Sequence, residues 1–252
     1  MFDNLASPGP LRFNNFAYAL REFLRHVFHR LAPEDAVKEC GWYKPHPTSK
    51  TGITRTHRSK FMIQGGLSDQ FLRKKLGIDV VPVLTDLSDT FDMLNTFTHI
   101  NPTTFGISNS AVASHAESSL QAATYLIEHI RECRGRVLSG LRSAIDKHVM
   151  SRALSETIVE IDELATHHLV DTVMIENSEI ASIGSTSLMV SVEGNVEVEL
   201  QYGSGSDLKN DMGAVIDESF PFTAQIEITF KRPLGSSASV SELSVDTSSW
   251  YE

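Results

Sequence analysis

Cysteine is scarce in this chain, because only Cys40 and Cys133 occur among its 252 residues. Two thiols cannot supply a disulfide framework or a four-thiolate zinc site, so we expect a protein of the reducing cytoplasm. A long apolar run is missing too. No uncharged stretch approaches the roughly 20 residues that cross a bilayer, and the first ten residues lack the pattern of a secretory signal. The sequence therefore predicts a cytoplasmic protein without membrane association.

Basic residues are nearly absent from the last third of the chain. Residues 1–168 hold 19 Lys and Arg against 18 Asp and Glu, whereas residues 169–252 hold 3 against 14. A segment this acidic repels a phosphate backbone. We therefore expect any contact with RNA or DNA to lie in the N-terminal half.

Helical periodicity dominates the chain up to about residue 164. Apolar residues spaced three and four apart predict helices over residues 15–31, 67–76, 83–97, 109–148 and 152–164. Gly135 and Gly140 weaken the case for one unbroken helix over 109–148. Residues 41–60 are polar, contain two prolines and have no stable period, so we interpret them as a long connection.

After His168 the hydrophobic period becomes two. Alternation is clearest over Val196–Tyr202, and other β-like runs are 173–183, 188–192 and 222–230. The turn signals are Gly184-Ser185, Glu193-Gly194 and residues 203–205. The predicted fold class is α+β. It comprises a helical N-terminal domain (1–168), a small antiparallel β-sheet domain (169–234) with one wet, acidic face, and a Ser-rich tail (235–252).

Arg21 and His26 form the most informative pair for chemistry, as R-x-x-x-x-H in the first long helix. Five positions turn a helix by about 500°, so the two side chains lie about 140° apart and converge only through a groove or a second subunit. A neutral His can take the proton of a 2′-hydroxyl, and an Arg can stabilise charge on phosphoryl oxygens. The pair therefore suggests metal-independent RNA cleavage, although an ordinary solvated helix face explains it as well.

Other residues extend this hypothesis. His99 lies where the helix over 83–97 ends, where it can complete the site or merely cap carbonyls. Arg25 and His29 continue the cationic surface of the first helix, and Arg55, Arg58 and Lys60 form a further basic cluster. We predict that these five basic residues contact nucleic acid, with an exposed charged face as the alternative.

A metal site is the weaker alternative. Asp207 and Asp211 lie in a Gly- and Ser-rich segment and could hold Mg²⁺ or Mn²⁺ through oxygen ligands. The segment lacks the ordering of a calcium loop, and a polar hairpin loop explains it more simply. We therefore predict no cofactor.

The amino-acid sequence resembles two groups of proteins. The helical half, with Arg21 and His26 and the segment Asn95–His99 ahead of a long amphipathic helix, is similar to the HEPN-type helical superfamily. The whole layout resembles the predicted nucleases associated with bacterial PIWI modules. The segments that carry this resemblance are LSDTFDMLNTFTHINPTTF (87–105), LQYGSGSDLKNDMGAVIDESFPF (200–222) and DTSSWYE (246–252).

These resemblances imply a bacterial anti-phage or conflict setting and a nuclease activity. Many HEPN-type enzymes are dimeric RNases, so the resemblance implies a homodimer and nominates Arg21 and His26 as catalytic residues. It also implies a larger defence effector as partner. The alternative is a non-catalytic sensor or adaptor subunit that binds such an effector, which the acidic sheet and the aromatic C-terminal residues favour.

Overall fold

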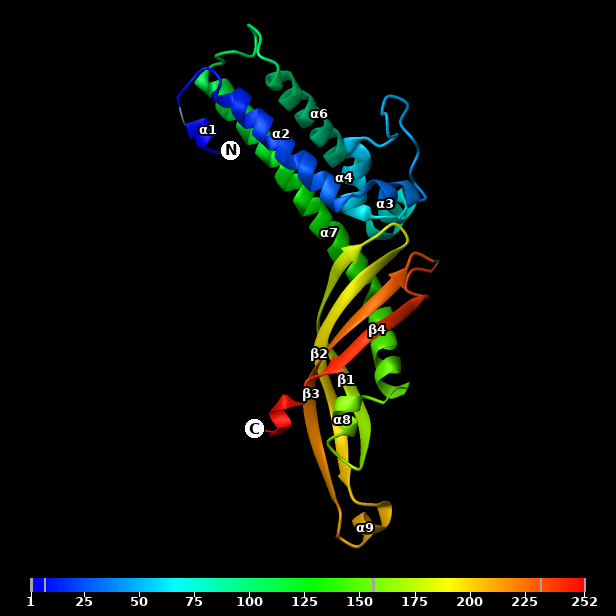
Figure 1. Cartoon of the computed structure of the whole chain (residues 1–252). Helices are drawn as coiled ribbons and strands as arrows, with labels where there is room; N and C mark the ends of the chain where they lie inside the picture. Colours follow the sequence, from blue (N-terminus) through cyan, green and yellow to red (C-terminus); the bar gives the residue numbers. More distant parts are fainter. Residues whose placement is uncertain (1, 7, 156, 232, 252) are drawn as a thin grey trace. The chain divides into compact units, whose positions relative to one another are not determined.

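The computed structural model describes residues 2–6, 8–155, 157–231 and 233–251. Residues 1, 7, 156, 232 and 252, which fall within the three predicted domains, lie outside the described residues. Helices occupy the N-terminal part and an antiparallel sheet follows (Figure 1), so the predicted α+β class is confirmed.

The chain divides into two compact units. The first takes in the residues up to Arg136 together with Gly184–Thr186, and the second takes in Val137–Ile183 and the residues from Ser187 onward. The long helix α7 (Asn109–Ser155) contributes to both units and continues through Gly135 and Gly140. Neither glycine would bring an added Cβ within 4 Å of another atom. Both therefore cost the helix only backbone entropy, which the rest of its length offsets.

The first unit is helical. Besides the first part of α7 it contains α1 (Phe2–Ala6), α2 (Arg12–Leu31), α3 (Glu34–Glu39), α4 (Arg55–Gln64), α5 (Asp69–Phe71), the π-helix η1 (Leu72–Leu76) and α6 (Val81–Thr98). The predicted helices over 15–31, 67–76 and 83–97 therefore exist. The predicted connection over 41–60 is shorter than expected, because α4 begins at Arg55 with Thr54 as its cap.

Aromatic side chains hold α2 and α6 together. Phe13 meets Phe97 edge to face at 4.7 Å between ring centroids, and Phe28 meets Phe91 at 5.5 Å. All four rings are buried. The order of these pairs makes the two helices antiparallel, and Asn14 Nδ2 donates to the Phe97 carbonyl at 2.8 Å. The helices lie side by side in Figure 1.

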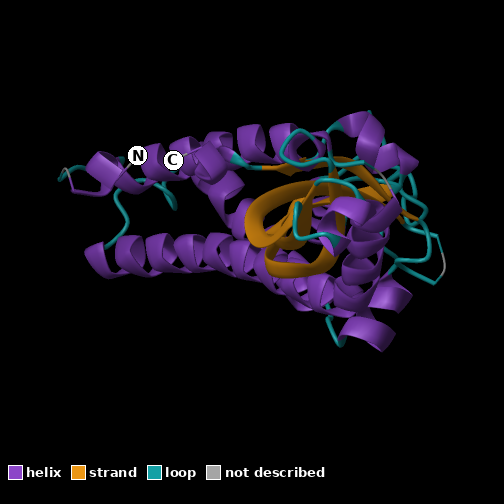
Figure 2. Ribbon diagram, turned by 90° about the horizontal axis from the view of Figure 1, so that it is seen from below, coloured by secondary structure: helices purple, strands orange, loops and turns teal. Residues whose placement is uncertain are grey.

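The second unit is built on four antiparallel strands in sequence order. They are β1 (His167–Ile183), β2 (Ser187–Tyr202), β3 (Ala214–Thr229) and β4 (Ala238–Val245). Figure 2 draws them as one continuous curved sheet. The short elements of this unit are α8 (Val159–Asp162), α9 (Gly205–Lys209) and the 3-10 helix η2 (Ser248–Tyr251). The Ser-rich segment from 235 thus supplies the edge strand β4, which the periodicity did not predict.

The side chains of β2 alternate strictly, and its even-numbered residues from Leu188 to Leu200 are buried. The predicted turn at Glu193-Gly194 is wrong, because β2 runs straight through it. Gly194 pairs with Ile175 beside a bulge of β1. An added Cβ on Gly194 would lie 2.0 Å from the Met174 carbonyl oxygen. This glycine permits a close backbone approach within the sheet, which is a known use of strand glycines.

Within the part of the chain that the structure describes, no helix combines the length and the apolar character that crossing a bilayer requires.

Two glycine substitutions in the second unit test this account. Gly194→Ala should destabilise the unit by about 1–3 kcal/mol, because the methyl group overpacks the β1–β2 approach. Gly140→Ala should stabilise it by about 0.5–1 kcal/mol, since that helical position is open and alanine loses less entropy. Urea unfolding of both variants gives the comparison. Equal midpoints for the two proteins would contradict the assigned role of Gly194.

Candidate active site

Four polar residues of α2 form a chain of side-chain contacts, which we call the α2 row: Arg21, Glu22, Arg25 and His26. Glu22 lies between the two arginines. Its Oε1 accepts from Arg21 Nη2 and its Oε2 accepts from Arg25 Nε, both at 2.9 Å. The single carboxylate therefore holds two guanidinium groups in place and leaves the row with a net positive charge.

The tip of Arg21 reaches the last turn of α6. Its Nη1 lies 3.3 Å from Thr98 Oγ1 and 3.5 Å from Asn95 Oδ1. The Thr98 hydroxyl donates its own hydrogen to the Asn95 carbonyl at 2.7 Å, so its oxygen is free to accept. The guanidinium carbon also lies 5.6 Å from the centre of the Tyr18 ring. Arg21 is thus fixed from three sides.

His26 lies on the surface at the other end of the row. Arg25 Nη2 approaches His26 Nε2 at 3.5 Å. A guanidinium has no acceptor, so a hydrogen bond across this contact exists only in the tautomer whose Nε2 carries a lone pair.

His99 caps α6 and is exposed. Its carbonyl accepts from Thr104 Oγ1 at 2.7 Å. His99 directly follows Thr98, which contacts Arg21. His26 lies five positions after Arg21 on α2. Among the described residues, no recorded contact joins His99 to Arg21 or His26. The structure thus links Arg21, Arg25 and His26, but not His99, into one chain of contacts.

The predicted nucleic-acid contacts have different surroundings. Arg58 is only 6% exposed and donates to the carbonyl of Ala32, the C-cap residue of α2. Lys60 Nζ lies 2.8 Å from the Asp69 carboxylate and 4.5 Å from the centre of the Trp42 ring. Both cations therefore tie elements of the first unit together.

The remaining two predicted contacts are more open. Arg55 stacks over Phe91, with its guanidinium carbon 4.7 Å from the ring centre. His29 is exposed near the end of α2. Its pKa is lowered first by desolvation and then by the positive charges of Arg58 and Arg25.

A cavity of about 870 Å³ opens where α4 begins. Its lining comes from the loop before α4, from the first turns of α4 and from α6: His46, Thr48, Ser49, Ile53, Thr54, Arg55, Thr56, His57, Ser59, Leu84, Leu87, Ser88, Phe91 and Asp92. Sequence reasoning missed this site because it treated 41–60 as a connection. The signal that was present is the density of His, Ser and Thr in that segment.

Backbone hydrogen bonds fix the tautomers of the two histidines in this cavity. The Thr54 N–H donates to His57 Nδ1 at 3.1 Å, and the Thr48 N–H donates to His46 Nδ1 at 3.4 Å. A backbone N–H cannot accept, so each Nδ1 bears the lone pair and each Nε2 bears the hydrogen. Both rings therefore offer an Nε2–H donor to a ligand. The pKa of His57 is lowered, mainly by burial and then by His46, which favours its neutral form.

Of the two acidic candidates in the second unit, Asp207 has structural partners. Asp207 Oδ2 accepts from the backbone N–H and the hydroxyl of Ser204, both at 2.7 Å, in the capping box that begins α9. These hydrogen bonds lower its pKa. Asp211 has a left-handed backbone with φ of 55°. Over the described ranges, no group of three or more His, Cys, Asp or Glu is placed to hold a metal ion.

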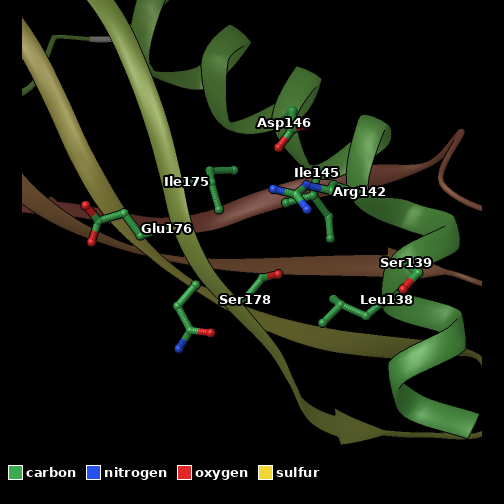
Figure 3. A pocket seen from close by; sticks show the side chains of 9 residues that line it. Leu138, Ser139, Arg142, Ile145, Asp146, Ile175, Glu176 and Ser178 are labelled. Atoms are coloured by element: carbon green, nitrogen blue, oxygen red, sulfur yellow. The ribbon is translucent and has the colours of Figure 1, made fainter. Parts of the chain in front are cut away.

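A smaller hollow of about 220 Å³ lies within the second unit, between α7 and β1. Figure 3 shows Arg142 and Asp146 on α7 and Ile175 and Ser178 on β1 around it. Glu176 on its strand side accepts from Asn195 Nδ2 at 2.7 Å. This hollow is mixed in charge and too small for a drug-sized ligand.

Comparison with known proteins gives one consistent result. Two family models, each described as a predicted pPIWI-associating nuclease, match residues 1–123 and residues 130–251. Together they span nearly the whole chain. No curated protein and no solved structure matches it.

The α2 row predicts a measurable property of Glu22. Hydrogen bonds from Arg25 and then from Arg21 hold the pKa of this carboxyl below its ordinary value of 4.5. A carboxyl whose pKa is lowered by folding adds stability above its unfolded pKa, and that stability is lost as the pH falls through the folded pKa. Carbon-detected NMR titration should therefore give a Glu22 midpoint below 4.5, and Arg25→Gln should raise it. A midpoint that Arg25→Gln leaves in place would contradict the pairing.

Proposed function

Because the chain belongs to the family of predicted pPIWI-associating nucleases, we propose that it cleaves nucleic acid, with RNA favoured, as part of a bacterial anti-phage defence. The family name also points to a PIWI-type protein as the partner. The observation that carries the chemical proposal is the α2 row, in which one carboxylate positions two guanidinium groups beside an imidazole.

The proposed reaction uses these groups directly. A phosphodiester oxygen competes with Glu22 and His26 for the donors of Arg21 and Arg25, because guanidinium binds phosphate strongly and with two parallel hydrogen bonds. Release of His26 Nε2 then exposes its lone pair. The imidazole takes the proton of the 2′-hydroxyl, and the 2′-oxygen attacks phosphorus and displaces the 5′-oxygen. The products are a cyclic 2′,3′-phosphate and a 5′-hydroxyl end.

The other predicted residues have supporting roles in this proposal. His99 adjoins the Arg21 contact at Thr98 and would donate the proton to the leaving oxygen if a substrate bridges the distance. Arg25, His29 and Arg55 would contact the strand outside the scissile bond. Arg58 and Lys60, which are engaged inside the unit, would support the fold beneath that surface. A second copy of the chain would place a second α2 row across the substrate.

Substitutions in the α2 row test this proposal. Loss of a general base typically lowers the rate by 10²–10⁴-fold, so His26→Ala should reduce RNA cleavage by about that factor. Arg21→Ala should also reduce it strongly. Arg30→Ala, an exposed substitution on the same helix, is the matched control and should cleave normally. The measurement is single-turnover cleavage of a labelled RNA in EDTA.

Two further outcomes bear on the mechanism. A 2′-deoxy substitution at the cleaved nucleotide should abolish cleavage there, because the nucleophile is gone. The proposed chemistry is wrong if folded His26→Ala and Arg21→Ala both cleave at the wild-type rate. It is also wrong if cleavage of DNA equals that of RNA.

The outward face of the sheet favours a second function, that of a non-catalytic adaptor. The four strands contain no Lys or Arg. In the strand register, the carboxylates that share this face are Glu179, Glu193, Glu197, Glu199, Asp217, Glu227 and Glu242. Such a face attracts a basic protein surface and steers its approach. The adaptor would use it to dock a PIWI-type protein.

Charge reversal tests the adaptor function. The double variant Glu197→Lys/Glu199→Lys should weaken co-purification with a PIWI-type protein of the same organism, and rising salt should weaken the wild-type complex. The matched control is Asp86→Lys/Asp89→Lys on the exposed side of α6, which should retain the partner. If both double variants retain the PIWI-type protein equally well, the sheet is not part of the interface.

A further inference from the structure

The lining of the cavity at the start of α4 combines apolar and polar side chains. The apolar residues are Ile53, Leu84, Leu87 and Phe91. The loop before α4 and the first turn of α4 also supply hydroxyls, two imidazoles and one guanidinium. A cavity lined by apolar residues and a few polar groups has the usual composition of a small-molecule site. The ligand must therefore join a flat or apolar part to a polar part.

The polar residues of the lining supply several hydrogen-bond donors. Arg55 supplies a guanidinium that is always charged, and His46 and His57 each supply an Nε2–H, as their tautomers require. Thr48 and Thr56 add hydroxyls. Asp92 is the one carboxylate in the described lining. This balance of charge favours an anion with several oxygens beside these donors. The Asp92 carboxylate suits a sugar hydroxyl.

The cavity is held in shape before any ligand arrives. The loop from His46 to Gly52 closes on itself, with the His46 N–H donating to the Gly52 carbonyl at 2.8 Å. Ser49 Oγ donates to the Ile53 carbonyl at 2.7 Å. Gly52 has φ of +77°, and an added Cβ would lie 2.6 Å from the Tyr43 hydroxyl oxygen. A loop with this many internal bonds loses little entropy on binding, which favours affinity.

Arg55 covers the buried ring of Phe91, with its guanidinium carbon 4.7 Å from the ring centre. Guanidinium planes and aromatic rings are the surfaces on which proteins stack unpaired bases. The volume of about 870 Å³ lies in the range of sites for drug-sized ligands.

We propose that this cavity binds a nucleoside phosphate, with the base against the apolar residues and the Arg55 guanidinium plane, and the phosphate on the donors of Arg55, His46 and His57. The same chemistry is offered by a free mononucleotide and by the phosphorylated end of a strand. If the site binds the phosphorylated end of a strand, the inference rests on the proposed function. If it binds a free mononucleotide, the inference is independent of that function.

Calorimetry on the full chain tests the proposal. The probes are the four ribonucleoside 5′-monophosphates, the matching nucleosides, inorganic phosphate, and an oligonucleotide with either a 5′-phosphate or a 5′-hydroxyl. We expect a nucleotide or the 5′-phosphorylated strand to bind at least tenfold more tightly than nucleoside, phosphate or the 5′-hydroxyl strand. Binding of the mononucleotide identifies a free ligand, whereas binding of the strand alone identifies a strand end.

Two variants locate the binding. Arg55→Leu keeps an apolar side chain on Phe91 and removes the charge, so affinity should fall roughly tenfold to hundredfold. Ser88→Trp fills the cavity from the exposed surface of α6 and should abolish binding while leaving Arg55 intact. Arg30→Leu, on α2 and outside the cavity, is the matched control and should bind normally. Circular dichroism checks that each variant is folded.

The outcomes separate this inference from the cleavage proposal. A mononucleotide has no scissile bond, so its binding does not depend on catalysis, and His26→Ala should bind it like the wild type. Cleavage by a protein that binds no probe overturns the inference alone. Nucleotide binding by a protein that cleaves nothing overturns the cleavage proposal alone. Unchanged affinity in folded Arg55→Leu and Ser88→Trp, or phosphate binding as tight as that of nucleotide, also overturns the inference.

Discussion

The aromatic packing between α2 and α6 is the interaction on which the rest of the first unit depends. Each buried phenylalanine contributes about 1.5–3 kcal/mol through burial, and the edge-to-face pairs add roughly 0.5–1.5 kcal/mol. The Phe13–Phe97 pair brings the end of α6 to the tip of Arg21, and the Phe28–Phe91 pair presents Phe91 to Arg55. The α2 row and the cavity therefore rely on the same helix pair.

The two units differ in the sign of the charge that they carry. The helical unit carries the cations that phosphate requires, whereas the strands of the second unit carry carboxylates and no Lys or Arg. Since like charges repel within about a Debye length, the proposed contact with nucleic acid belongs to the first unit. The proposed contact with a basic protein surface belongs to the sheet. Membership of a family of predicted nucleases that associate with PIWI proteins is compatible with both contacts in one complex.

The cations of the first unit illustrate how far sequence reasoning reaches. Arg55, Arg58 and Lys60 look alike as text, yet Arg58 is buried against the end of α2 and Lys60 pairs with Asp69. Only Arg55 of the three lines the cavity. Their separate surroundings come from elements distant in the chain, which no local spacing encodes. Sequence reasoning missed the histidines of the cavity for the same reason. Whether a polar loop lines a cavity depends on the helix against which it packs.

The sequence by itself determined that a helical part precedes an antiparallel sheet, that the period changes near His168 and that charge is distributed unevenly, because periodicity and charge are local properties of the sequence. It also carried the family resemblance. Only the tertiary structure decided that β2 continues through Gly194, that the Ser-rich segment adds a strand, and that Arg21 contacts Asn95 and Thr98. These features depend on partners far along the chain: a bulge in β1, the edge of β3 and the last turn of α6. Contacts of this kind form only when the chain closes on itself, so local pattern could not specify them.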